Sequence, residues 1–109
     1  MKKSLIYSLV FSAIMFCGTT VHAEDYVITI KNNQFSPNEL SIPAGQKIKI
    51  IVKNQDATPA EFESYELNRE KVVTANSEIT VYIGPLNPGI YGYFDDFHRD
   101  TTKGTIIVK

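Results

Sequence analysis

The chain has 109 residues, of which 43% are hydrophobic and 21% are charged, with eleven Lys and Arg against twelve Asp and Glu. This near-neutral balance lacks the basic excess of a nucleic-acid-binding protein, so nucleic acid is not expected as a partner. The single cysteine excludes an intramolecular disulfide framework, and the length suits one small domain with a modest core.

Residues 1–23 have the three parts of a secretory signal peptide: a basic start, an apolar run over residues 5–17 and small residues before Glu24. The apolar run is shorter than the roughly 20 residues of a membrane-spanning helix, and no later segment approaches that length. We therefore predict cleavage before Glu24, export to the periplasm as a mature domain of residues 24–109, and no membrane insertion after cleavage. Lipid attachment at Cys17 is an alternative, although a bulky residue precedes it.

Loss of the signal peptide makes the chain more acidic. Residues 24–109 contain nine Lys and Arg against twelve Asp and Glu, a net charge of −3, and neither cysteine nor methionine. Seven of the twelve acids fall within residues 61–70 and 95–100. Such a concentration produces a local negative field that attracts cations, and the alternative is that it serves solubility alone.

Short β-branched runs separated by turn residues follow one another from Tyr26 to the end of the chain. In the run Lys47–Val52, for example, Ile48 and Ile50 lie on one face of an extended chain. Clusters of Asn, Pro, Ser and Gly separate the runs. We predict strands over residues 26–30, 40–42, 47–52, 71–73, 78–83, 90–94 and 104–109.

No segment after the signal peptide shows a sustained helical period, although residues 62–67 fit either one helical turn or extended chain. Seven or eight short strands, largely antiparallel and with turn signals between them, indicate an all-β fold of the β-sandwich type.

The first group of candidate metal ligands lies in residues 61–66. On an extended chain Glu61 and Glu63 point to the same face, roughly 7 Å apart, whereas Phe62 points to the other face. Glu66 joins them only if the chain turns after Ser64. The alternative is a strand whose acidic side chains are simply solvated.

The second group surrounds His98, the only histidine beyond the signal peptide. Asp95, Asp96 and His98 offer carboxylate and imidazole ligands on a short segment that two phenylalanines would anchor, and Asp100 follows. The alternative is a surface histidine paired with a neighbouring acid, which contributes little to stability.

Carboxylates with one imidazole suit hard or borderline ions: ferrous or ferric iron, Mn(II), Cu(II), or Zn(II) when four ligands bind. Cu(I) is disfavoured, because residues 24–109 supply no thiolate or thioether. One histidine without a cysteine also leaves no recognisable nucleophilic triad.

Two segments, FSPNELSIPAGQKI over residues 35–48 and GIYGYFDDFHRDTTKGTIIVK over residues 89–109, resemble the cupredoxins. The resemblance covers nearly all of residues 24–109 and implies a cupredoxin-like Greek-key β-sandwich.

The resemblance also shows where this chain departs from a blue-copper protein. A blue-copper member has its first histidine where this chain has Glu61 and its cysteine where this chain has Asp95 or Asp96. Its methionine falls where this chain has a threonine. Only His98 remains of the four usual ligands, so an electron-transfer copper site is not expected.

The acidic segments EFES over residues 61–64 and DDFH over residues 95–98 look like those of cupredoxin-like domains associated with bacterial ferrous-iron uptake. This resemblance implies that the protein binds an iron or copper ion for an inner-membrane iron permease. Carried over residue by residue, it implies that the metal ligands are Glu61, Glu63, Glu66, Asp95, Asp96 and His98.

Three hypotheses follow from these observations. We expect a periplasmic metal-binding protein of cupredoxin type that serves metal uptake. The second hypothesis is a ferroxidase that oxidises Fe(II) for a permease. The third is a metal-free module that uses its acidic patch to dock a basic surface.

Overall fold

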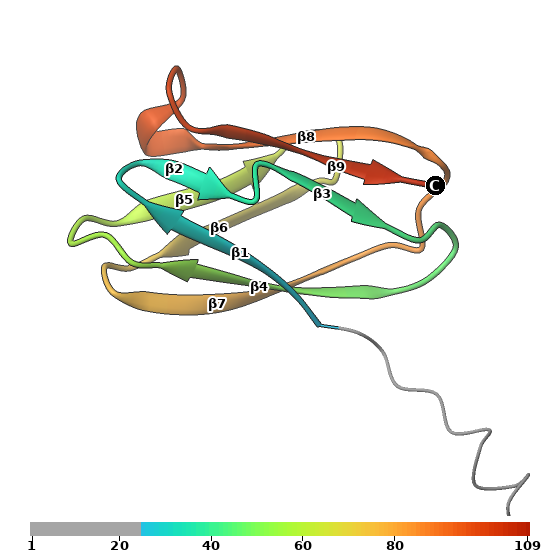
Figure 1. The fold of residues 1–109 in the computed structure, drawn as a ribbon, viewed down its shortest axis with the longest axis horizontal. Helices are drawn as coiled ribbons and strands as arrows, with labels where there is room; N and C mark the ends of the chain where they lie inside the picture. The colour runs from blue at the N-terminus through green and yellow to red at the C-terminus, as the bar shows by residue number, and fades with distance from the viewer. Residues whose placement is uncertain (1–24) are drawn as a thin grey trace, which may run out of the picture.

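Nine strands form two sheets in the computed structural model, which describes residues 25–109 (Figure 1). The first sheet has the order β2-β1-β4-β7 and the second has the order β3-β9-β8-β5-β6. In chain order the strands are β1 (Asp25–Lys31), β2 (Gln34–Ser36), β3 (Glu39–Ile42), β4 (Ile48–Asn54), β5 (Ala60–Ser64), β6 (Arg69–Val73), β7 (Ser77–Ile83), β8 (Gly89–Asp95) and β9 (Lys103–Val108). A single 3₁₀ turn, η1 (Asp96–His98), joins β8 to β9.

Most of the strand pairs are antiparallel, and only β1–β4 and β3–β9 are parallel. The all-β sandwich expected from the sequence is therefore confirmed, with nine strands instead of seven or eight. The two strands missing from the sequence prediction are β2 and β5. Strand β2 has only three residues, and β5 carries glutamates on its outer face, which are poor strand formers by propensity.

Alternate residues of the central strands fill the space between the sheets. Ile50 and Val52 of β4 are fully buried, as are Phe62 of β5 and Ile106 of β9. The Tyr93 ring of β8 stacks on Phe62 at 5.2 Å between ring centroids. This packing keeps β5 and β8 in a fixed relation, so the residues just beyond them are placed by the core.

Gly104 of β9 lies opposite Tyr93 of β8. A Cβ atom at this glycine would come within 2.4 Å of the Tyr93 ring, so any side chain there would displace the ring. The packing of the Tyr93 ring in the core therefore requires glycine at this position of β9.

Figure 1 shows η1, the β1–β2 turn and the β4–β5 loop together at the end of the sandwich opposite the C-terminus. Asp56 of the β4–β5 loop accepts hydrogen bonds from the backbone N–H groups of Asn32 (2.7 Å) and Asn33 (2.9 Å). The Thr102 hydroxyl donates to the Asn33 carbonyl oxygen at 2.5 Å. These bonds join three loops that are distant in the sequence.

Within residues 25–109 no helix has the length and apolarity needed to cross a membrane. The predicted signal peptide, residues 1–23, lies outside the described residues.

Candidate metal centre

Asp95, the last residue of β8, is 1% exposed and has a partner at each carboxylate oxygen. Its Oδ1 accepts from the backbone N–H groups of Glu61 (2.9 Å) and Phe97 (3.0 Å), and its Oδ2 lies 2.9 Å from Nδ1 of His98. The carboxylate thus caps η1, connects it to β5 and holds the imidazole. The structure gives Asp95 the position of a residue that orients His98.

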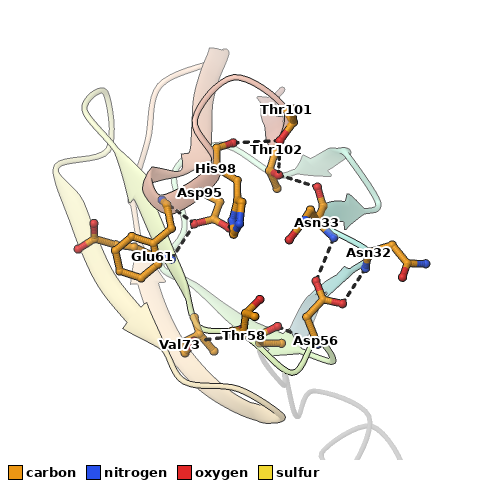
Figure 2. Close-up of polar contacts among 12 residues, drawn as sticks. Asn32, Asn33, Asp56, Thr58, Glu61, Val73, Asp95, His98, Thr101 and Thr102 are labelled. Carbon is orange, nitrogen blue, oxygen red and sulfur yellow. Dashed lines mark hydrogen bonds and ion pairs between the residues drawn. The ribbon is translucent and has the colours of Figure 1, made fainter.

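The His98 ring is partly exposed, with 32% of its side chain accessible. In a neutral imidazole beside an ionised carboxylate, which can only accept, Nδ1 carries the hydrogen toward Asp95 and Nε2 keeps a lone pair. A carboxylate that holds the second ring nitrogen is the usual support of a metal-binding histidine. Figure 2 shows the ring turned toward the space that Thr102, Asn33 and Asp56 surround.

A second group of ligand atoms lies on the outer face of the second sheet. Single oxygen atoms of Glu61, Glu63 and Glu70 lie within 4.8 Å of one another. Glu63 of β5 is directly opposite Glu70 of β6 in the strand register. We call these three residues the carboxylate cluster.

Alternation along β5 separates the carboxylate cluster from the core. Phe62 points inward and is fully buried, and Asp95 is its partner in the register, so Asp95 points inward as well. The flanking Glu61 and Glu63 point outward. In Figure 2 the Glu61 side chain extends away from His98.

Burial and the neighbouring carboxylates raise the pKa values of two glutamates of the carboxylate cluster. Burial raises the pKa of Glu61 above its ordinary value, and a hydrogen bond to Asp96 and the charges of Glu70, Asp96 and Glu63 raise it further. Burial, followed by the charges of Glu70 and Asp96, also raises the pKa of Glu63. A cation among these oxygens would relieve the repulsion that these pKa shifts report.

Asp96 lies beside Glu61 of the carboxylate cluster and has a cationic partner. The Arg99 guanidinium donates to Asp96 Oδ1 through both Nε, at 3.0 Å, and Nη2. This contact is the largest cause of the lowered pKa of Asp96, with a smaller contribution from its hydrogen bond to Glu61. The pKa values of these two neighbouring carboxyls are thus shifted in opposite directions, that of Glu61 upward and that of Asp96 downward.

The structure distributes the six sequence-predicted ligands over three places. Glu61, Glu63 and Asp96 lie at the carboxylate cluster, and Asp95 and His98 form a pair at the end of the sandwich. Glu66 lies apart, because its Oε1 accepts the backbone N–H of Gly92 at 2.9 Å. The prediction that these residues bind an ion stays a prediction.

Glu70 was not predicted from the sequence. The signal that could have found it is the antiparallel pairing of residues 60–64 with residues 69–73, which puts it opposite Glu63. That register is invisible unless Ala60–Ser64 is first assigned as a strand.

Comparison with known proteins agrees with this architecture. Residues 4–108 match the family described as cupredoxin-like domain. A protein of Rickettsia prowazekii, RP394, is 48% identical over 82 residues, which are 75% of this chain and 66% of that protein, so the chain spans just under two thirds of this relative.

Solved structures with less than 25% identity share the fold. Auracyanin A from Chloroflexus aurantiacus has a TM-score of 0.69 at 16% identity, covering 81% of this chain and all of the other. The metal-binding domain of CopA from Streptococcus pneumoniae gives 0.72 at 13%, covering 83% and 91%. Amicyanin from Paracoccus versutus gives 0.64 at 21%, covering 82% and 85%. On the family match and the two-sheet architecture together, this chain belongs to the family of cupredoxin-like domains.

Proposed function

We propose that this protein binds a hard or borderline metal ion, iron or Cu(II), at the carboxylate cluster, and that it serves metal uptake in the periplasm. The observation that carries the proposal is the convergence of Glu61, Glu63 and Glu70 to within 4.8 Å. Three carboxylates at this separation repel one another in the metal-free protein, and a bound cation turns that repulsion into attraction.

The spacing is close to that of a coordination sphere. Oxygen ligands about 2.1 Å from an ion can lie at most about 4.2 Å apart. Glutamate side chains are long enough to close the remaining gap by small torsional changes. Asp96 supplies a fourth carboxylate beside Glu61, whereas Glu66 is held by Gly92 and is left out of the proposed ligand set.

The donor atoms favour a harder ion than the one that the related structures hold. Auracyanin A is described as a blue copper protein, and the CopA domain was solved with Cu(I). These descriptions support metal binding by the fold. Residues 24–109 have no cysteine or methionine, so the proposed site offers carboxylate oxygen atoms in place of the soft ligands that Cu(I) requires.

Export and delivery complete the proposal. The basic, apolar and small-residue parts of residues 1–23 support secretion, and the likeness of the acidic segments to iron-uptake domains supports a permease as the partner. Deletion of the gene should lower the uptake of labelled iron at limiting concentration, and a copy that encodes Glu63→Gln/Glu70→Gln should fail to restore it. Full uptake in the deletion strain would contradict a role in iron supply.

Calorimetric titration of the metal-free protein with Fe(II), Fe(III), Cu(II) and Zn(II) tests the site itself. We expect one of the iron or copper ions to saturate a site that the Glu63→Gln/Glu70→Gln variant has lost. Cu(II) should give no intense blue colour, because no thiolate is available. Glu78→Gln, an exposed glutamate of β7, is the matched control and should bind as the unchanged protein does. Equal affinity in the double variant and the control would refute the site.

A further inference from the structure

A groove opens on the outer face of the second sheet where β5 ends. Strands β5 and β8 are paired only at Phe62–Asp95 and Glu63–Phe94. Beyond this point the backbone groups of Gly92 in β8 bond to side chains instead of to the backbone of β5. Ser64 Oγ donates to the Gly92 carbonyl oxygen at 2.6 Å, and Glu66 accepts the Gly92 N–H. The groove has a volume of about 450 Å³, within the range of small-molecule sites.

Two aromatic rings form its wall. The Tyr65 and Phe94 rings meet edge to face with centroids 5.3 Å apart, and Tyr65 remains 67% exposed. Both residues line the groove, so their rings offer an apolar surface to a ligand. Aromatic rings stack on such surfaces with a gain beyond that of area burial alone.

Gly92 forms the floor and leaves it empty. A Cβ atom at this position would meet only Glu66 Oε1, at 3.2 Å. The position faces outward, because its neighbour Tyr93 points into the core. The groove is therefore deep at this point because residue 92 is glycine. The packing of the core does not require a glycine there.

The rim is cationic although the chain is acidic. The Arg99 guanidinium lies 4.9 Å from the centroid of the Phe94 ring and is paired with Asp96. Lys103 also lines the groove, and within residues 25–109 no carboxylate forms an ion pair with it. The one acid of the lining, Glu66, is bonded to the Gly92 N–H. The Lys103 ammonium is therefore available to form an ion pair with an anionic group of a ligand.

We propose that this groove binds a small organic acid that carries an aromatic ring. The ring lies over Gly92 against Tyr65 and Phe94, and the carboxylate faces Lys103 with Arg99 beside it. The rings of Tyr65 and Phe94 favour a ligand with an aromatic ring. The Lys103 ammonium, which has no ion-pair partner within residues 25–109, favours a ligand with a negative charge. This proposal does not depend on the carboxylate cluster, because Glu61, Glu63 and Glu70 do not line the groove.

Amide chemical shifts of the full-length protein, titrated with 2-naphthoate in the presence of EDTA, test the groove without a metal. We expect saturable shifts at Gly92, Gly104 and Thr105, and weaker binding of the neutral 2-naphthamide. Lys103→Gln should weaken 2-naphthoate roughly threefold, as for an exposed ion pair. Lys31→Gln, an exposed lysine of β1, should leave the affinity unchanged.

Gly92→Val should abolish binding, because its side chain fills the floor. Tyr65→Ala removes the exposed wall without touching the core and should weaken binding even if the valine variant folds poorly. Saturation without shifts at the groove amides would overturn the proposal. So would equal affinity for naphthoate and naphthamide, or unchanged affinity in both Lys103→Gln and Tyr65→Ala.

Discussion

Asp95 illustrates, at the scale of one residue, how a buried carboxylate sets the geometry of a site. Its two oxygens accept from Glu61 and Phe97 and hold His98, which brings β5, η1 and the imidazole together. A buried carboxylate is costly unless its hydrogen bonds are satisfied, and here each oxygen has a partner. Asp95 therefore fixes the relative positions of β5, η1 and the His98 ring at this end of the sandwich.

Asp95→Asn should change the histidine more than the fold. The amide oxygen can still accept from the two backbone N–H groups, but the amide NH₂ faces Nδ1 of His98 and forces the ring hydrogen onto Nε2. We expect a loss of about 1.5–3 kcal/mol in unfolding free energy, typical of hydrogen bonds to charged groups. Nitrogen-15 NMR of the imidazole should report the exchanged tautomer.

The exposed Asp100→Asn is the control for that measurement. An unchanged tautomer in Asp95→Asn would show that the Asp95 carboxylate does not orient the ring.

At the scale of elements, strands β5 and β6 combine core packing with like charges on their outer face. Phe62 and Val73 are fully buried and hold the pair to the core. Glu63 and Glu70 face each other directly, an arrangement that destabilises an antiparallel pair. The core offsets this repulsion, which is consistent with an acidic face kept for a cation.

The metal-free protein should lose stability as the pH rises through the pKa values of Glu61 and Glu63. A group that is easier to protonate when folded contributes stability below its unfolded pKa, and that contribution disappears above its folded pKa. Both glutamates have pKa values raised above the ordinary 4.5, mainly by burial, so the loss begins near that pH and extends upward. The lowered pKa of Asp96 acts in the opposite direction only below its ordinary 3.8.

Urea unfolding at pH 5 and pH 7.5 measures this effect. The decrease in stability between the two values should be smaller in Glu63→Gln than in the unchanged protein, and Glu78→Gln should follow the unchanged protein. A Glu63→Gln profile parallel to that of the unchanged protein would contradict the assignment.

At the scale of the whole molecule, a small domain without disulfides must rely on its paired strands and its ligands. Residues 25–109 contain no cysteine, and their two sheets enclose one core. The proposed ion would bridge β5 and β6 on the outside of that core. Binding to the folded state alone stabilises the fold by mass action.

Thermal unfolding with and without the ion tests this linkage. At a free ion concentration 100 times the Kd, the free energy of unfolding should rise by about 2.7 kcal/mol. The Glu63→Gln/Glu70→Gln variant should show no rise under the same conditions. An unchanged midpoint with every ion tried would favour an acidic docking module over a metal-binding protein.

The sequence by itself determined the all-β class, most of the strands and the acidic composition of the candidate site. Apolar alternation and turn residues depend on local chemistry, which a sequence displays. The split of the six predicted ligands was decided only by the tertiary structure. The register of β5 with β6 brought Glu70 to Glu63, and that with β8 turned Asp95 inward to hold His98. Glu66 accepts a hydrogen bond from the backbone N–H of Gly92, which has no partner in β5 because that strand has ended. Strand register and the fate of unpaired backbone groups are set by contacts between distant segments, so no local pattern contains them.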